Sequence, residues 1–262
     1  MTQAASTLPD FSTLQLPADA LDGRVIAITG ATDGLGRALA VACTAHGAQV
    51  ILIGRQVKRL EAVEREANAL GKHRALLAPL DLEKALAGDY DQIAVALEQQ
   101  FGRLDGLVHA AAQVGNLAPI EHYDVPGWCR LLHVNLTAPF VLTQVLLSNL
   151  RAAPDASILF TSCAQAVRSG PYWGAYAASK AGLDALAHSL AAEWDAGKGP
   201  RVNSVDPGAL RTRLRRQAYP SADLESLPLP EARVAAFLWL LSGASRGVHG
   251  QRIALDAMTA DP

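Results

Sequence analysis

Short apolar runs alternate with longer segments of helical period along most of the chain, and this alternation limits the possible folds more than any other feature. The runs occupy residues 24–29, 49–53, 74–80, 104–110, 157–162, 201–205 and 252–255. Such alternation is typical of βα units that feed a parallel sheet. Because the runs are almost continuously hydrophobic, we expect helices on both faces of the sheet. The sequence therefore predicts an α/β fold, a doubly wound, seven-stranded parallel sheet flanked by helices.

Glycines mark the ends of two predicted helices. Segments 35–46 and 56–70 have helical period and are followed by Gly47 and Gly71, which tolerate the left-handed backbone of a helix C-cap. Right-handed crossovers bring the carboxyl ends of parallel strands to one edge, where ligands bind in such folds. Functional side chains are therefore expected in the loops that follow strands.

The chain of 262 residues is long enough to bury a sizeable core as one domain. We expect a short N-terminal arm over residues 1–22 and a single domain over residues 23–262. Residues 206–229 are rich in Pro and Arg and lack a regular period. They are predicted to form a loop or lid, with a substrate loop near residues 208–229.

Charge and cysteine content exclude several classes of function. The formal net charge of −2 gives no basic surface for nucleic acid or an anionic membrane. Cys43, Cys129 and Cys163 are far apart in the chain, which argues against both a disulfide framework and a metal site. The N-terminal residues lack the pattern of a secretion signal, and no stretch approaches the ~18 uninterrupted apolar residues of a spanning helix. A cytoplasmic protein with a small-molecule partner is expected.

A glycine-rich segment, TGATDGLGRALA, follows the first predicted strand directly. Gly30, Gly34 and Gly36 lead into a helix, where glycines let the backbone approach a pyrophosphate at the helix N-terminus. The spacing is GxxxGxG rather than the general GxGxxG, and no GKS or GKT signals a P-loop. An ordinary glycine-rich turn is the alternative, but the strand-loop-helix context favours a dinucleotide site.

The end of the second strand bears on the choice of cofactor. Dinucleotide folds place an acid there for a ribose 2′-hydroxyl, or an Arg nearby for a 2′-phosphate. This chain has Gly54 and Arg55, so NADP(H) is favoured over NAD(H), with Arg37 as a second cation and Asp33 as an opposing charge. The alternative is that Arg55 only solvates a helix start. Asp81 either accepts a hydrogen bond from adenine or caps a helix.

Tyr176 and Lys180 lie four residues apart at the start of a predicted helix, on one face. A neighbouring ammonium stabilises a phenolate and lowers the pKa of the phenol. Such a tyrosine can transfer a proton to or from a carbonyl oxygen. By itself the pattern also occurs on solvated helices.

Taken together, the motifs resemble those of the short-chain dehydrogenase/reductase family. TGATDGLG, LDL at 80–82, VN at 134–135, YAASK and NSVDPGALRT occur in the family's order and at its usual separations, over residues 22–257. ITGATDGLGR, VILIGR and WGAYAASK are most similar to the YciK-like oxidoreductases. The resemblance implies a Rossmann fold and an NADP(H)-dependent oxidoreductase acting on a carbonyl or alcohol.

The resemblance also implies roles for single residues. Tyr176 would be the acid-base group, Lys180 would activate it and hold the nicotinamide ribose, and Asn135 would keep a water in a proton relay. A buried asparagine satisfied by backbone is the alternative for Asn135. The cofactor-binding positions would be Gly30, Thr32, Asp33, Gly34, Leu35, Gly36, Arg55, Asp81, Leu82, Ala111, Tyr176, Lys180, Pro207, Gly208, Leu210 and Thr212. No metal is implied.

Two segments depart from the family pattern. Thirteen residues before Tyr176, where the family has a serine, the chain has Cys163, with Ser162 beside it. A thiol is a weaker donor than a hydroxyl, so the substrate carbonyl would be less polarised unless Ser162 takes its place.

The second departure is HAAA at 109–112, where the family has an NNAG-like stretch. Ala110 removes an amide that ties the central strands together, and Ala112 replaces a glycine that gives the cofactor room. We interpret His109 as structural, since no partner for a ligand role is visible beside it.

The sequence leaves the substrate open. A carbonyl reductase or alcohol dehydrogenase is favoured; the alternative is a non-catalytic or weakly active nucleotide-binding or regulatory protein on the same fold. Tyr172, Trp173 and Tyr219 are candidates for an apolar wall. The arginines of the lid either attract an acidic substrate or are only a solvated surface. The resemblance further implies a homodimer or homotetramer that uses helices near 124–150 and 176–195.

Overall fold

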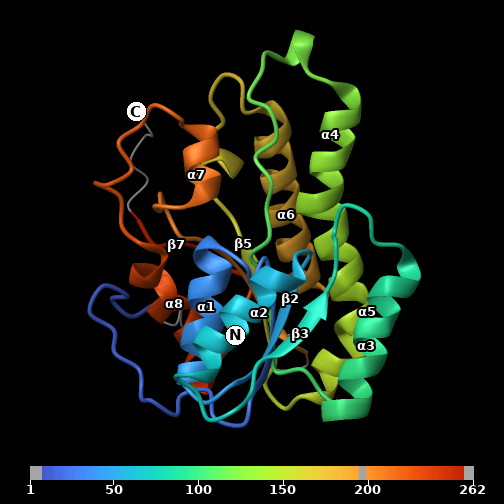
Figure 1. The fold of residues 1–262 in the computed structure, drawn as a ribbon, viewed down its shortest axis with the longest axis vertical. Coiled ribbons are helices and arrows are strands. Elements are labelled where there is room, and N and C mark those ends of the chain that lie inside the picture. The colour runs from blue at the N-terminus through green and yellow to red at the C-terminus, as the bar shows by residue number, and fades with distance from the viewer. Residues whose placement is uncertain (1–7, 195–198, 257–262) are drawn as a thin grey trace, which may run out of the picture.

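The computed structural model describes residues 8–194 and 199–256, and in them seven parallel strands form one sheet (Figure 1). The strands are β1 (Val25–Thr29), β2 (Gln49–Gly54), β3 (Leu76–Pro79), β4 (Gly106–His109), β5 (Ser157–Thr161), β6 (Arg201–Asp206) and β7 (Arg252–Ala254). Their order is β3-β2-β1-β4-β5-β6-β7, so the crossover reverses between β1 and β4. The predicted doubly wound sheet is confirmed, and the ends of each strand lie within two residues of the predicted range; β3 and β4 both start two residues later than predicted.

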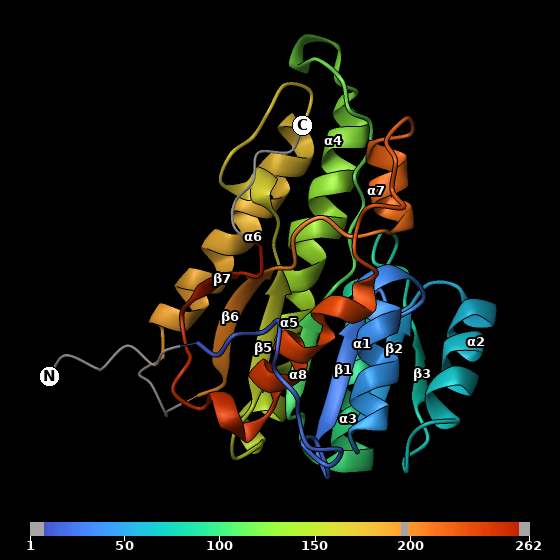
Figure 2. The same ribbon diagram turned by 90° about the vertical axis from the view of Figure 1, so that its left-hand side faces the viewer.

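Helices cover both faces of the sheet (Figure 2). One face carries α1 (Gly34–Ala45), α2 (Val57–Asn68) and α8 (Val234–Leu241); the other carries α3 (Ala87–Phe101), α5 (Ala138–Ala152) and α6 (Gly174–Ala192). Strand β1 shows why its run is continuously apolar. Ile26 and Ile28 pack into the first core, whereas Val25 and Ala27 pack into the second. Both sets of side chains are therefore removed from water, as predicted.

The predicted helix at 124–150 is one continuous helical segment that contains a wider, π-helical turn. It consists of α4 (Val125–Leu132), a π-helical turn at His133–Thr137 and α5. Its length and composition would allow Val125–Ala152, within the described part of the chain, to cross a membrane. Here α4 packs on α6 and α5 packs on α3.

The predicted loop at 206–229 contains a helix that the sequence pattern did not reveal. Helix α7 (Arg213–Ala218) begins after Thr212, whose hydroxyl accepts the Arg215 N–H at 3.1 Å. The prediction of a wholly irregular loop is therefore wrong for these six residues. A helix of fewer than two turns is too short for its periodicity to be recognised, and only the cap of Thr212 marked it.

Residues 8–22 of the predicted arm pack against the domain. The Phe11 ring meets Trp239 of α8 edge to face at 5.7 Å between ring centroids, and Leu21 is fully buried. The first seven residues of the expected arm and the last six of the expected domain lie outside the described residues. The boundary between arm and domain stays a prediction.

A buried arginine lies at the start of β6, at the end of the sheet opposite the carboxyl ends of the strands. Arg201 is 5% exposed, and its guanidinium donates to the carbonyl oxygens of Leu240 at 2.9 Å and Ser242 at 3.1 Å. Its Nε also donates to Asp155 at 3.0 Å. Arg201 thereby satisfies carbonyls at the end of α8 that have no partner inside the helix.

Candidate active site

A cavity of about 600 Å³ opens at the carboxyl ends of the strands, where the topology predicts a ligand site. Loops after six strands line it. It contains every expected site residue except Gly36 and Asn135: Gly30, Thr32, Asp33, Gly34, Leu35, Arg55, Asp81, Leu82, Ala111, Ser162, Cys163, Tyr176, Lys180, Pro207, Gly208, Leu210 and Thr212. Residues from distant parts of the sequence therefore share one cleft.

Close packing explains Gly30, in the loop between β1 and α1, and Gly36, in the first turn of α1. Gly30 has a φ of 67°, and a Cβ there would lie 2.8 Å from the backbone of Ala111. A Cβ on Gly36 would lie 2.3 Å from the Gly30 carbonyl oxygen. The Asp33 carboxylate caps α1 by accepting the Gly34 N–H at 2.8 Å. Gly36 therefore lets the Gly30 carbonyl pack closely against α1 outside the cavity, whereas Gly30 and Gly34 line the cavity.

Tyr176 and Lys180 face the cavity from the first turns of α6. Tyr176 is 7% exposed and Lys180 is 2% exposed. The Lys180 ammonium donates to the Thr161 carbonyl at the end of β5 at 2.8 Å, and it lies 6.0 Å from the centroid of the Tyr176 ring. The Cys163 side chain shares a hydrogen bond with that of Tyr176. A phenol, an ammonium and a thiol thus meet beside the glycine-rich loop.

This arrangement has close counterparts among known proteins. A model of the short chain dehydrogenase family matches residues 24–223. The chain belongs to the short-chain dehydrogenase family. It is therefore an oxidoreductase of this family, and the predicted resemblance is confirmed.

Individual relatives cover nearly the whole chain. An oxidoreductase of Escherichia coli named YciK, uncharacterised, is 35% identical over 88% of this chain and 91% of its own. A short chain dehydrogenase structure from Pseudomonas syringae is 39% identical, with a TM-score of 0.90 over 92% of this chain and 98% of its own. A short chain dehydrogenase structure from Shigella flexneri, complexed with NADP, is 33% identical, with a TM-score of 0.88 over 91% and 99%.

The pKa of the tyrosine in this short-chain dehydrogenase moves opposite to the sequence-based expectation. Burial raises the pKa of Tyr176 well above 10, and the neighbouring Cys163 and Asp206 act in the same direction, while Arg215 opposes them. Burial also lowers the pKa of Lys180. The net pKa shift of Tyr176 is therefore opposite to the expected lowering, because the cost of burying a phenolate exceeds the opposing effect of Arg215. At neutral pH Tyr176 carries its proton.

The structure places Cys163, rather than Ser162, beside the tyrosine. The Ser162 hydroxyl donates to Asp184 at 2.7 Å. Arg252 of β7 donates to the same carboxylate at 3.0 Å and to the Cys163 carbonyl at 3.0 Å. This ion pair holds the loop after β5, so that the Ser162 hydroxyl points to Asp184 while the Cys163 thiol faces Tyr176. The pattern around YAASK contained no signal for Asp184 or Arg252.

Asn135 lies behind the cavity, in the π-helical turn. Its amide oxygen accepts the Gln113 N–H at 2.8 Å, and its amide nitrogen donates to the Gln113 carbonyl at 2.8 Å and to Ser179 at 3.0 Å. These contacts match the alternative of a buried asparagine satisfied largely by backbone. They also join the loop after β4 to α6, one residue before Lys180.

Thr29 compensates for part of the HAAA departure. Its hydroxyl accepts the N–H groups of Ala110 at 3.1 Å and Ala111 at 3.2 Å, which ties the end of β4 to β1. His109 stacks on Phe160 at 4.8 Å between ring centroids and hydrogen-bonds Thr143 at 2.8 Å. Burial lowers its pKa to about 3, so its ring is neutral. These contacts agree with the structural interpretation of His109.

The two arginines considered for a 2′-phosphate differ in position. Arg55 lines the cavity, is half-exposed, and lies 4.0 Å from Glu83, an acid that the sequence analysis did not single out. Arg37 pairs with Glu66 at 2.5 Å and with Glu231 at 3.3 Å on the outer side of α1. Arg37 is thus paired with two acids and, unlike Arg55, does not line the cavity.

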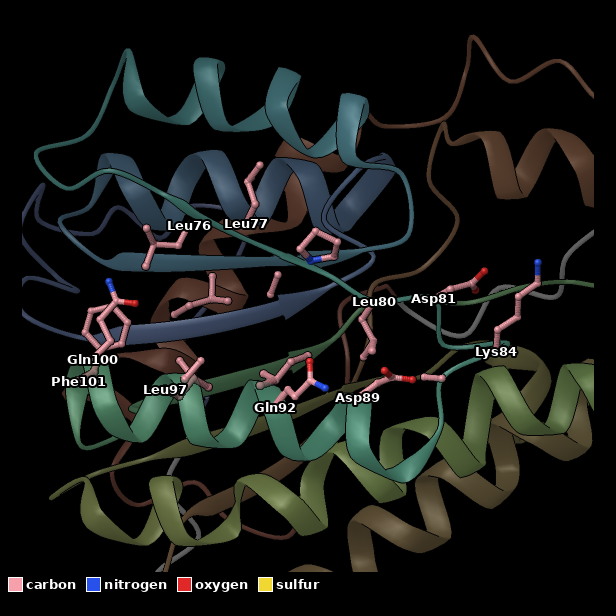
Figure 3. A pocket seen from close by; sticks show the side chains of 16 residues that line it. Leu76, Leu77, Leu80, Asp81, Lys84, Asp89, Gln92, Leu97, Gln100 and Phe101 are labelled. Atoms are coloured by element: carbon pink, nitrogen blue, oxygen red, sulfur yellow. The ribbon is translucent and has the colours of Figure 1, made fainter.

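A second cavity, of about 430 Å³, lies away from Tyr176, Lys180 and Cys163 (Figure 3). It lies between the edge strand β3 and α3, and the side chains of Leu80 and Leu97 line its apolar wall. Asp81, at its mouth, lines both cavities. Within residues 8–194 and 199–256, no cluster of three His, Cys, Asp or Glu side chains is arranged to hold a metal ion.

Proposed function

We propose that this chain is an NADP(H)-dependent oxidoreductase that interconverts a small carbonyl compound and the corresponding alcohol. The observation that carries the proposal is the meeting of Tyr176, Lys180 and Cys163 in the same cavity as the glycine-rich loop and Arg55. The NADP bound by the Shigella flexneri relative supports the choice of cofactor. NADPH oxidation against a panel of aldehydes and ketones tests the reaction.

The residues present fit NADP(H). Gly30 and Gly34 leave the backbone without side chains where α1 begins, so N–H groups and the positive end of the helix are accessible to a pyrophosphate. Arg55 supplies a cation for a 2′-phosphate, and Asp81 supplies an acceptor for adenine. Pro207, Gly208 and Thr212 line the same cavity, and they would contact the nicotinamide half of the cofactor.

Each polar side chain at the reacting end has a defined task in this proposal. When bound, the nicotinamide donates or accepts a hydride. The Tyr176 hydroxyl, protonated at neutral pH, donates its proton to the carbonyl oxygen, and the Cys163 thiol orients that oxygen by a hydrogen bond. The Lys180 ammonium, held by the Thr161 carbonyl, stabilises the phenolate that remains and is placed to bind the ribose hydroxyls.

Substitution of Cys163 by serine is expected to raise kcat about 3- to 10-fold, since a hydroxyl polarises a carbonyl better than a thiol does. Steady-state NADPH oxidation measures the change. Cys129→Ser, at an exposed cysteine, is the matched control and should have no effect.

This substitution also separates the main proposal from the alternative of a non-catalytic nucleotide-binding protein. If neither the wild type nor Cys163→Ser turns over any carbonyl, while both bind NADPH, the alternative is supported. A loss of activity in Cys163→Ser would contradict the role given to this position.

Substitution of Arg55 by aspartate is expected to weaken NADPH binding on the order of 10-fold more than NADH binding, because a charge-assisted contact to the 2′-phosphate is lost from a half-exposed site. Fluorescence titration of both cofactors measures the two dissociation constants. Arg59→Asp, at an exposed position of α2, makes the same change of charge away from the cavity. Equal effects on NADPH and NADH would contradict the assignment of Arg55.

The homodimer or homotetramer implied by the family stays a prediction, as does the cytoplasmic location. Phe140 on α5 is 44% exposed and Val125 on α4 is 70% exposed, which is compatible with an interface on these helices.

A further inference from the structure

The arginines near the active-site cavity contact different parts of it. Arg213 of α7 pairs with Asp33 at 3.0 Å, beside the glycine-rich loop. Arg215 of the same helix stacks on the Tyr219 ring, with its guanidinium 3.8 Å from the ring centroid. Arg252 differs from both, because it belongs to β7 and contacts the segments at the ends of β5 and β6.

Arg252 binds three separate parts of the active site through one guanidinium. Strand β7 pairs with β6 at the end of the sheet (Figure 2). The Nε of Arg252 donates to Asp184 of α6 at 3.0 Å, and its Nη2 donates to the Cys163 carbonyl and to Asp206, each at 3.0 Å. The planar guanidinium holds these acceptors in a fixed arrangement, which the compact ammonium of a lysine does not.

The first of these parts is the loop after β5, which carries the thiol. Ser162 is tied to β6 by its N–H, which donates to the Val205 carbonyl at 2.8 Å, and to α6 by its hydroxyl, which donates to Asp184. Cys163 follows in an extended conformation, and its carbonyl is held by Arg252. The backbone on both sides of the Cys163 side chain is therefore fixed, and this sets the direction of the thiol toward Tyr176.

The second part is the turn after β6. Asp206 is 5% exposed, and its Oδ2 accepts from Arg252 while its Oδ1 accepts the Gly208 N–H at 3.0 Å. Gly208 has a φ of 76° and lines the cavity beside Pro207. One carboxylate thus connects Arg252 to the turn that would contact the nicotinamide half of the cofactor.

The third part is helix α6. Tyr176, Lys180 and Asp184 follow one another at intervals of four residues, so they lie along one side of the helix. The charges of Asp184 and Asp206 oppose the lowering of the Lys180 pKa by burial. Arg252 therefore holds in place the two carboxylates that favour the charged form of Lys180.

We propose that Arg252 is a positioning residue of this active site, which fixes the direction of the Cys163 thiol relative to the turn at Gly208. This inference rests on the proposed reaction, in which the thiol, the proton donor and the nicotinamide must meet at one carbonyl group. Arg252 lies outside the cavity wall, so it acts through the residues that it holds. A displacement of reacting groups by about 1 Å is enough to lower a rate on the order of 100-fold.

Arg252→Gln is expected to lower kcat for carbonyl reduction about 10- to 100-fold, because the thiol and the turn are no longer held together. The dissociation constant of NADPH should change less than about 3-fold, since Arg55 and the glycine-rich loop are untouched. Arg252→Lys should recover little of the lost kcat, because it keeps the charge without the planar fork. Full recovery by lysine would contradict the positioning role.

Arg24→Gln is the matched control. It removes a partly buried ion pair, Arg24 with Asp155 at 2.8 Å, at the opposite end of the sheet. Its kcat should equal that of the wild type. An equal loss of kcat in Arg24→Gln and Arg252→Gln would mean that any lost ion pair disturbs the site, and would overturn the inference.

A double-mutant cycle shows whether Arg252 acts through the thiol. In a Cys163→Ala background, Arg252→Gln should lower kcat less than about 3-fold further, because no side-chain donor remains to be oriented. A merely structural role would lower kcat by the same factor in both backgrounds, and this result would reject the proposal.

Alkylation of Cys163 gives a test that needs no turnover. It uses Cys129→Ser, in which the fully buried Cys43 and the partly buried Cys163 remain. Adding Arg252→Gln should raise the rate of iodoacetamide labelling at Cys163 several-fold, measured by mass spectrometry, because the loop opens locally. Adding Arg24→Gln instead should not.

Cys43 serves as an internal reporter of general unfolding in this measurement, since it is 0% exposed. Faster labelling of Cys163 alone supports the inference even if no carbonyl is reduced. Faster labelling of both cysteines would mean that Arg252 only stabilises the fold. An unchanged rate at Cys163 would mean that Arg252 does not hold the thiol, and either of these two results overturns the inference.

Discussion

Replacement of Tyr176 by phenylalanine is expected to lower kcat for carbonyl reduction on the order of 1000-fold, the usual contribution of a positioned proton donor. The substitution removes only the hydroxyl. The ring keeps its edge contact with Trp173, and Lys180 keeps its hydrogen bond to Thr161. Steady-state NADPH oxidation with the best substrate of the carbonyl panel gives the ratio of turnover numbers.

Tyr172→Phe is the matched control for this experiment. Tyr172 lies four residues earlier and is 57% exposed, so loss of its hydroxyl should leave kcat unchanged within about 2-fold. NADPH affinity should fall far less than kcat in Tyr176→Phe, because only the hydroxyl is lost and the ring stays in the wall of the cavity. A Tyr176→Phe variant with full activity would reject the catalytic assignment.

Replacement of Arg201 by methionine is expected to lower the free energy of unfolding by about 3–5 kcal/mol, the usual cost of removing one partner of a buried ion pair. The change removes the donors for the carbonyls of Leu240 and Ser242 and leaves Asp155 with one fewer cation. The corresponding fall in melting temperature is about 10 °C for a chain of this size. Denaturant unfolding followed by circular dichroism measures the difference at a fixed protein concentration.

Arg246→Met is the matched control for Arg201. Arg246 pairs with the same Asp155 at 3.5 Å, but its side chain is 73% exposed, so its loss should cost less than about 1 kcal/mol. Equal midpoints for Arg201→Met and the wild type would show that the ends of β6 and α8 do not depend on this arginine.

Local patterns predicted the fold almost completely. The seven apolar runs match the seven strands, because a strand buried on both faces must be apolar throughout. Gly47 follows α1 as expected and has a φ of 92°. The pattern failed where elements are short or irregular. Helix α7 has only six residues, and the π-helical turn at His133–Thr137 is indistinguishable from an α-helix by apolar spacing.

The sequence predicted which residues form the candidate site better than it predicted their pKa values. Motif order located the glycine-rich loop, Tyr176 and Lys180, and the cavity brings them together. The pKa direction of Tyr176 could not be predicted, because it depends on how deeply α6 is buried against β5 and β6. The supporting contacts of Thr29 and Arg252 join residues about 80 or more positions apart and leave no local pattern.

The sequence by itself determined the layer architecture, the family and the identity of the polar groups at the carboxyl edge of the sheet, since these follow from hydrophobic period and motif order. Only the tertiary structure decided that Cys163 rather than Ser162 meets Tyr176, and that Arg215 rather than Arg213 faces the aromatic wall. Each of these two pairs consists of neighbours or near neighbours in the chain. The directions in which their side chains point are set by contacts with Asp184, Arg252 and Tyr219, which only the tertiary packing brings close.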